Sequence, residues 1–289
     1  MNTIIMTDSN CDLHEEYLNE NKVPVIPFLF NLNGKDYEDN FGKSISYKEF
    51  YDELRKGGLS TTSQITPYTY EEYFKKYVNE GCSIIYIAFS SALSESYNHS
   101  LLARENVLQE FPNADITVID SKAASVGQGI LVQKAIDMHK DGKTNKEIIN
   151  WLENNKMKVN QWFTVDSLDY LKRGGRLSTT SFVLGTLMSV KPILIVDKNG
   201  KLSPIKKVRG RKKAIMDLFN ELKNTATSMN DETVYISHAD CYEDALYLKE
   251  LISNELTVKE VLINNLGPII GTHTGPGLLN LAFMGQERV

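Results

Sequence analysis

The chain has 289 residues, of which 42% are hydrophobic, and it carries a formal net charge of −5 at pH 7. A chain of this length can bury a large core and forms one or two domains. The net negative charge argues against nucleic acid as the main partner. No uncharged apolar run approaches the roughly 18 residues that a membrane-spanning helix needs, so we expect no stable membrane insertion.

The N-terminal segment and the cysteines both indicate a cytoplasmic protein. Residues 1–8 lack the basic segment and the long apolar core of a signal peptide, and they are typical of a first strand. Cys11, Cys82 and Cys241 are scattered, odd in number and without a Cys-x-x-Cys pair. This set predicts a reduced cytoplasmic protein that has neither a disulfide framework nor a zinc site.

In the first half of the chain, apolar strands alternate with helices. Asn33-Gly34 predicts a hairpin, and Ser46 predicts the cap of a helix that ends at Gly57-Gly58. The alternation indicates βαβ units and a mainly parallel sheet. The strands are predicted at residues 4–7, 23–30, 83–88 and 115–120, and the helices after them end near residues 19, 79, 108 and 139.

Polar residues with hydroxyl groups recur after these strands, where the next helix would begin. Asp8-Ser9 follows the first strand, and five of the nine residues at 59–67 carry a hydroxyl. Similar residues occupy 90–98 and 121–129. Parallel strands bring their carboxyl ends to one edge of a sheet, where small molecules bind. Each segment alone is equally suited to be a helix cap or an ordinary loop, but their recurrence predicts a small-molecule site.

The polar, lysine-rich stretch at residues 155–160 predicts a domain boundary. We therefore expect an N-terminal α/β domain over residues 1–157 and a C-terminal α/β domain over residues 158–289. An apolar helix is expected at 181–188, either as core or as the lining of an apolar cavity. The other elements predicted in this half are strands at 161–165, 233–237 and 258–264, a hairpin of 192–196 with 201–208, and helices at 167–171 and 242–256.

A basic cluster at residues 206–213 is unusual in an acidic chain, since six of its eight residues are Lys or Arg. Cations at a helix N-terminus oppose the helix dipole, so helix stability does not explain the cluster. An anionic ligand group or an acidic protein surface would explain it. A solvated charged face is the alternative.

Residues 269–277 surround a single histidine, His273, with glycines, threonines and a proline. Ile269-Ile270 is typical of the end of a buried strand, and Pro276 suits the first turn of a helix over residues 278–284. A histidine at such a strand-to-helix turn is well placed to meet an anion, because the helix start offers free N–H groups. A glycine-rich turn in which the histidine only caps a backbone group is the alternative.

Taken together, the motifs of this chain resemble those of the DegV family, whose members include the fatty-acid-binding B subunit of bacterial fatty acid kinase (FakB). One departure is that Glu95-Ser96 stands where the family usually has Gly-Thr. The matching segments, in order along the whole chain, are Thr7-Asp8-Ser9 with Asp12-Leu13, Thr62-Ser63-Gln64, Leu93-Ser94 with Tyr97-Asn98, Asp120-Ser121, Ser125-x-Gly127-x-Gly129, Leu171-x-Arg173-Gly174-Gly175-Arg176, Lys191-Pro192-Ile193-Leu194, Lys207-Val208-Arg209-Gly210 and His273-Thr274-Gly275-Pro276-Gly277.

The resemblance implies two α/β domains, the first with a mainly parallel sheet and the second with a mixed sheet, and a long-chain fatty acid buried between them. It further implies a carrier that presents the fatty acid carboxylate to a separate ATP-dependent kinase subunit, which forms the acyl phosphate. No catalytic residue, metal or cofactor of its own is implied. Thr62, Ser63, Ser94, His273 and Thr274 would bind the carboxylate, and Arg209, Arg173 and Arg176 would form a kinase-docking or head-group surface.

Two enzymatic alternatives stay open. A serine hydrolase or acyltransferase would use Ser94 or Ser63 with His273 and an aspartate such as Asp8, although no Gly-x-Ser-x-Gly elbow surrounds either serine. Phosphoryl transfer by the chain itself would need a phosphate-binding loop of the Gly-x-x-x-x-Gly-Lys-Ser/Thr kind, which the sequence lacks. The preferred acyl chain and the oligomeric state are left open by the sequence.

Overall fold

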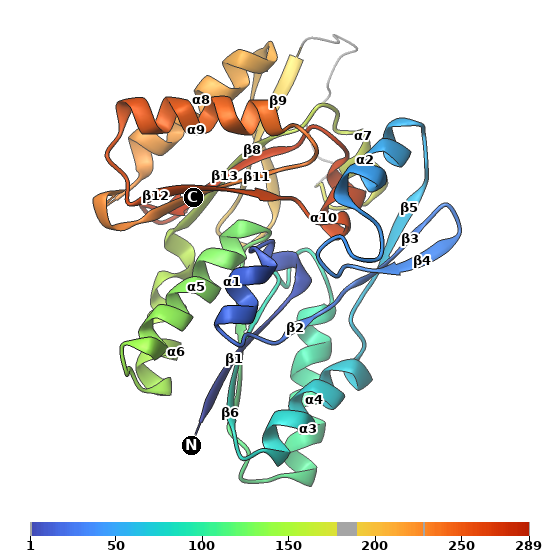
Figure 1. Ribbon diagram of the computed structural model, residues 1–289, viewed down its shortest axis with the longest axis vertical. Helices are drawn as coiled ribbons and strands as arrows, with labels where there is room; N and C mark the ends of the chain where they lie inside the picture. Colours follow the sequence, from blue (N-terminus) through green and yellow to red (C-terminus); the bar gives the residue numbers. More distant parts are fainter. Residues whose placement is uncertain (1, 178–189, 228, 289) are drawn as a thin grey trace.

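The computed structural model describes residues 2–177, 190–227 and 229–288, which form three sheets and their covering helices (Figure 1). Sheet A is parallel, with the order β2-β1-β6-β7. Sheet B is antiparallel, with the order β4-β3-β5. Its strands are β3 (Leu29–Leu32), β4 (Lys35–Glu38) and β5 (Ser60–Ser63), and those of sheet A are β1 (Thr3–Asp8), β2 (Val25–Ile26), β6 (Ser83–Ala88) and β7 (Ile116–Asp120).

Sheet A is covered by helices on both faces, so both faces of its strands pack against apolar side chains. Every residue of β6 is buried, as a central parallel strand requires. Met6 and Tyr86 belong to one hydrophobic cluster, and Ile5 and Ile85 belong to another on the opposite face. The helices α3 (Pro67–Asn79) and α4 (Ser96–Glu110) cover one face, and α5 (Val126–Lys140) and α6 (Asn145–Asn155) cover the other (Figure 1).

Sheet C is mixed and has the order β10-β9-β8-β13-β11-β12. Alternate residues of β13 face opposite sides, with Leu279 and Leu281 packed toward α8 and α9, and Ala282 packed toward α5. The elements of this part are β8 (Val159–Thr164), β9 (Val190–Val196), β10 (Leu202–Arg209), β11 (Thr233–His238), β12 (Glu260–Asn265), β13 (Leu279–Met284), α8 (Arg211–Thr225) and α9 (Tyr242–Glu255).

The predicted α/β class, with a parallel sheet followed by a mixed sheet, is confirmed. The strands of sheets A and B all precede residue 157, and those of sheet C all follow residue 158. Two of the hydrophobic clusters nevertheless contain residues from both halves of the chain. The division into domains 1–157 and 158–289 therefore remains a prediction.

The predicted elements at residues 269–284 are wrong. Ile269 and Ile270 lie in the short helix α10 (Pro268–Thr274), where Pro268 occupies the first turn. The expected helix over 278–284 is the fully buried strand β13. A short apolar run gives no period that separates a buried strand from a buried helix. Gly275 and Gly277, with φ of 75° and 83°, allow the chain to turn between the two elements.

Other predictions differ less from the structure. The strand expected at 23–30 is divided into β2 and β3, and part of the loop expected at 59–67 is strand β5. The hairpins and the helix capped by Ser46 are confirmed, whereas the helix predicted at 181–188 lies outside the described residues. No helix in the described ranges is long and apolar enough to cross a bilayer. The remaining short elements are η1 (Ser9–Cys11), α1 (Glu15–Glu20), η2 (Lys156–Lys158), α7 (Asp169–Arg173) and η3 (Met229–Asp231).

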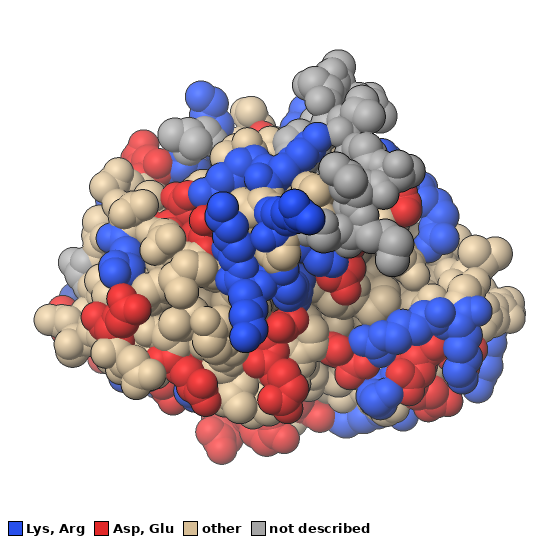
Figure 2. Space-filling model, turned by 90° about the horizontal axis from the view of Figure 1, so that it is seen from above, with Lys and Arg blue, Asp and Glu red and all other residues tan. Residues whose placement is uncertain are grey.

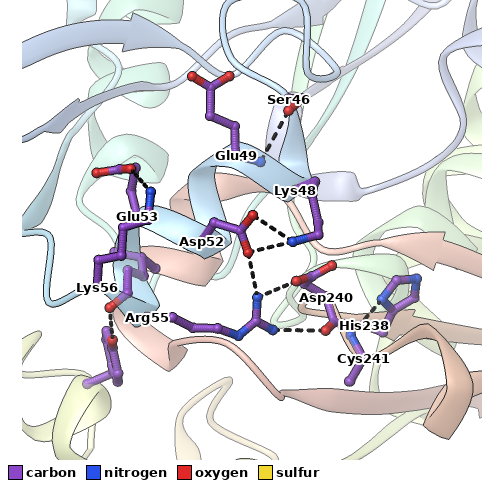
Figure 3. Close-up of polar contacts among 12 residues, drawn as sticks. Ser46, Lys48, Glu49, Asp52, Glu53, Arg55, Lys56, His238, Asp240 and Cys241 are labelled. Atoms are coloured by element: carbon purple, nitrogen blue, oxygen red, sulfur yellow. Dashed lines mark hydrogen bonds and ion pairs between the residues drawn. The ribbon is translucent and has the colours of Figure 1, made fainter.

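Helix α2 (Tyr47–Arg55) ties the first half of the chain to the second. Arg55 forms an ion pair with the carboxylate of Asp240, and its Nη2 donates to the Asp240 carbonyl at 3.0 Å (Figure 3). The buried Tyr51 hydroxyl donates to the Leu266 carbonyl at 2.9 Å, just before α10. These contacts fix α10 beside sheet B, and this placement determines the geometry of the site.

Candidate ligand-binding site

A largely apolar cavity lies between the carboxyl end of sheet A, sheet C and α10. Its empty volume is about 850 Å³, part of which is open to solvent at the mouth. The residues that line it are Asn10, Phe28, Thr62, Ser63, Gln64, Phe89, Leu93, Ser94, Ala124, Ser125, Gln161, Phe163, Arg176, Val196, Leu202, Leu266, Ile269, Ile270, His273, Thr274, Leu278 and Asn280.

Strand β5 and helix α10 meet at one end of this cavity. Thr62 Oγ1 lies 2.8 Å from His273 Nε2. Next to this pair along β5 and α10, the buried hydroxyls of Ser60 and Thr272 lie 2.7 Å apart. The predicted proximity of Thr62 and His273 is therefore present, although His273 lies in the last turn of a helix and not at a strand-to-helix turn. The expected help from a following helix N-terminus is absent, because β13 follows.

Ser94 lines the same cavity, just before α4. Its hydroxyl donates to Ser96 Oγ at 3.0 Å and accepts from the Ser96 N–H at 3.2 Å. Ser96 Oγ in turn accepts from the Ile65 N–H at 3.1 Å, which connects the turn to the segment after β5. Glu95 points elsewhere, because its carboxylate accepts from the Asn98 side chain at 2.6 Å.

Ser63 and Thr274 complete the predicted polar set, and both line the cavity. Ser63 is exposed at the end of β5, so its hydroxyl is available to a ligand at the mouth. Thr274 is buried, and its Oγ1 donates to the Ile270 carbonyl within α10 at 3.0 Å. The structure thus brings together all five residues that the resemblance assigned to carboxylate binding, with Thr274 committed to its own helix.

The three predicted arginines lie in different places. Arg176 lines the cavity, where its Nε donates to the Leu93 carbonyl at 3.3 Å and its Nη1 donates to the Gly174 carbonyl at 2.5 Å. Arg173 is exposed on α7, with its guanidinium 4.7 Å from the centre of the Tyr170 ring. Arg209 is exposed at the end of β10 and does not line the cavity.

The basic cluster divides into neutralised and exposed cations. Lys206 pairs with Glu221 at 2.9 Å, and Arg211 pairs with Asp244 at 2.8 Å. Arg209, Lys212 and Lys213 are exposed. The face of the molecule that carries α8 and α9 shows Lys and Arg side chains gathered around its centre (Figure 2). This surface suits an acidic macromolecule.

The imidazole of His273 is held in its neutral form. Burial, reinforced by the charges of Arg176 and Arg173, lowers its pKa to about 4. Its Nδ1 is buried without a hydrogen-bond partner among the described residues. Gly174 packs against that atom so closely that an added Cβ would lie 2.3 Å from it. An anion placed beside His273 would oppose this shift and raise the pKa.

The arrangement does not assemble a Ser-His-Asp triad. The carboxylate of Asp8 accepts hydrogen bonds from the Tyr86 hydroxyl at 2.8 Å and the Phe89 N–H at 3.0 Å, and burial raises its pKa to about 6. Within the described residues, it makes no hydrogen bond to His273, and Nε2 of His273 meets Thr62 and not a serine. In that same part of the chain, no group of three or more His, Cys, Asp and Glu side chains suits a metal ion.

Five polar residues of the cavity wall were not predicted as site residues. Gln64 and Ser125 belong to segments that match the family, and Asn10 lies between two parts of such a segment, but none of the three was given a role. Gln161 and Asn280 lie on β8 and β13, where a buried polar side chain gives no local signal. The misassigned helix at 278–284 also concealed the strand alternation that turns Asn280 toward the first half of the chain.

We predict that His273 titrates near pH 4 when the cavity is empty, because burial and two arginines disfavour the imidazolium. The folded state then binds fewer protons than the unfolded state between pH 4 and 6.5, so stability is lost as the pH falls through this window, by on the order of 3 kcal/mol. An NMR titration, assigned by the signal that disappears in His273→Asn, measures the midpoint. A midpoint at or above 6 would contradict the described environment.

Comparisons with known proteins identify the family of the chain. The DegV family, described as "Uncharacterised protein, DegV family", matches residues 2–286. A DegV domain-containing protein of Clostridium perfringens is 44% identical over 285 residues, which cover 99% of this chain and 98% of that protein.

Two solved structures of similar proteins are described as fatty acid binding. The DegV family protein of Thermus thermophilus has a TM-score of 0.89 at 30% identity and covers 99% of this chain and 100% of its own. DegV of Bacillus subtilis has a TM-score of 0.85 at 30% identity with the same coverage, 99% and 100%. On the strength of the match over residues 2–286, the chain belongs to the DegV family.

Proposed function

We propose that this chain is a carrier that binds one long-chain fatty acid, with the carboxylate at the end formed by β5 and α10 and the acyl chain in the apolar cavity. One observation carries the proposal: hydroxyls, a neutral imidazole and one arginine line a largely apolar cavity, and Thr62 and His273 meet at one end of it. The fatty-acid-binding relatives of Thermus thermophilus and Bacillus subtilis support it.

The free energies of the two ends of the ligand explain this distribution of side chains. The acyl tail supplies the affinity, at about 0.8 kcal/mol per buried CH₂, so a sixteen-carbon tail contributes on the order of 10 kcal/mol before the cost of association. The carboxylate is costly to bury without partners, so several donors must converge on it. Ser63, Ser94 and Thr62 offer hydroxyls, and Arg176 offers a positive charge at the mouth.

The tautomer of His273 determines whether the Thr62 hydroxyl can donate its proton to the ligand. When Nε2 carries the proton, it donates to Thr62 Oγ1 across the 2.8 Å contact and leaves the Thr62 hydroxyl proton for a carboxylate. The neutral ring thereby orients Thr62 without placing a second positive charge beside Arg176. In this arrangement His273 is a positioning residue for Thr62.

The second part of the proposal concerns a partner protein. The chain would present the bound carboxylate to a separate ATP-dependent fatty acid kinase subunit and would carry out no catalysis itself. The exposed Arg209 and Arg173 and the basic surface of Figure 2 supply charge for such docking. Three free cysteines suit the reducing cytoplasm, where ATP-dependent kinases act.

Replacing Thr62 by valine tests the carboxylate site, because the substitution keeps the branched shape and removes only the hydroxyl. We expect the affinity for hexadecanoic acid to fall by roughly tenfold, as for a lost hydrogen bond to a charged group. Thr61→Val is the matched control, since Thr61 is exposed on the same strand and does not line the cavity. Equal affinities of the two variants would remove Thr62 from the site.

Replacing Arg209 by alanine tests the docking surface. We expect the rate of acyl phosphate formation by the kinase subunit to fall several-fold while fatty acid affinity stays unchanged, because Arg209 lies outside the cavity. Lys198→Ala, at the other end of the same β9–β10 hairpin, is the control. If Arg209→Ala weakened both properties equally, Arg209 would belong to the binding site and not to a docking surface.

A further inference from the structure

Two buried asparagines line the cavity with amide atoms that lack hydrogen-bond partners. Asn10 is 1% exposed and Asn280 is 3% exposed. Nδ2 and Oδ1 of Asn10 and Oδ1 of Asn280 have no partner among the described residues. Buried amides are nearly always hydrogen-bonded, since desolvation without a partner is costly. Unpaired amide atoms on a cavity wall therefore indicate a polar group that enters the cavity.

The two asparagines come from other elements than Thr62 and His273, which lie on β5 and α10. A surface depression at the mouth shares Gln64, Leu93, Ser94, Arg176 and Leu202 with the cavity, and neither asparagine lines it. Asn10 follows the carboxyl end of β1 in sheet A, and Asn280 lies on β13, an inner strand of sheet C. A ligand whose carboxylate lies at Ser94 and Thr62 would reach them with its chain.

The Asn280 amide belongs to a buried chain of hydrogen bonds. The hydroxyls of Ser125 and Ser237 lie 2.9 Å apart, and Ser125 is also hydrogen-bonded to Asp12, whose pKa is held well above its usual range by burial. Ser237 Oγ accepts from Asn280 Nδ2 at 3.0 Å. The Asn280 atom left for a ligand is therefore Oδ1, which accepts a hydrogen bond.

Asn10 offers the complementary group. The turn at Ser9–Cys11 is capped by Asp8, whose Oδ1 accepts from the Asn10 backbone N–H at 3.1 Å. The Asn10 side chain takes no part in this cap and makes no other hydrogen bond with described residues. Its Nδ2 is thus a buried donor that local structure does not require.

We propose that this inner part of the cavity binds a hydroxyl group carried by the acyl chain, so that the preferred ligand class is a hydroxylated long-chain fatty acid. The inference rests on the proposed fatty acid binding and adds a second polar subsite to it. A hydroxyl can donate to Asn280 Oδ1 and can accept from Asn10 Nδ2. A methylene group at the same place would leave both amides desolvated and unpaired.

The test is a competition binding series on the full chain freed of lipid. Octadecanoic acid is compared with hydroxyoctadecanoic acids that carry the hydroxyl at successive carbons from the middle of the chain to its end. We expect at least one position to bind about tenfold more tightly than the parent acid, as for one hydrogen bond gained by a buried group. A series in which no hydroxylated acid exceeds the parent would overturn the inference and assign the two amides to a trapped water.

Three variants locate the effect. Asn280→Leu and Asn10→Leu keep the branched shape and the number of side-chain heavy atoms, and they should abolish or reverse the preference for the hydroxylated acid. Asn264→Leu is the matched control: Asn264 is also buried with an unpaired Oδ1 but does not line the cavity, so the preference should persist. A preference that survives both Asn280→Leu and Asn10→Leu would overturn the inference.

The failure of this inference and that of the proposed function give different results. If octadecanoic acid binds and hydroxylation adds nothing, the inner subsite is refuted while the carrier function stands. If neither octadecanoic acid nor any hydroxylated acid binds, the proposed function itself is refuted, and the inference is refuted with it.

Discussion

The contact between strand β5 and helix α10 is the interaction on which the polar end of the cavity depends. It joins residues more than 200 positions apart, through the paired hydroxyls of Ser60 and Thr272 and the contact of Thr62 with His273. Helix α2 packs against α10 and so supports this contact. Gly271 of α10 lies so close to Tyr51 of α2 that an added Cβ would be 2.5 Å from the tyrosine hydroxyl. The small residue permits this approach, and the approach brings the imidazole to β5.

The electrostatics of the site follow from the same packing. Burial keeps His273 neutral, so Arg176 is the one charged side chain that lines the cavity among the described residues. One positive charge and several hydroxyls suit a single carboxylate. A protonated His273 would add a second positive charge to that of Arg176 and would leave an excess of buried positive charge when the cavity is empty. The acidic groups of the first strand are turned away, since the Asp8 carboxylate is occupied by Tyr86 and Phe89.

The parts of the fold that could be predicted from the sequence are those marked by local capping and turn residues. Ser46 and Asn33-Gly34 carry their structural signal within a few residues, and the helix and the hairpin they mark are both present. Strand β13 carries no such signal, because all six of its residues are buried and only its pairing with β8 and β11 makes it a strand. The helix expected there was wrong for this reason.

The candidate site shows the same division. The recurrence of hydroxyls after strands indicated the segments that contain Thr62, Ser63 and Ser94, and the resemblance to the DegV family selected these residues within them. His273 stood out from the sequence because it lies among glycines. The contact of Thr62 with His273 and the turning of Asn280 into the cavity depend on long-range packing, which no local pattern records. The sequence also placed Arg209 and Arg176 in one set, whereas only Arg176 lines the cavity.

The most direct test of the carrier function is mass spectrometry of the purified protein, first under native conditions and then after denaturation and organic extraction. The proposed function predicts one long-chain fatty acid per chain, bound in the native protein and released on denaturation, and its mass identifies the acyl chain. A protein that is purified empty and that takes up no added fatty acid would contradict the proposal.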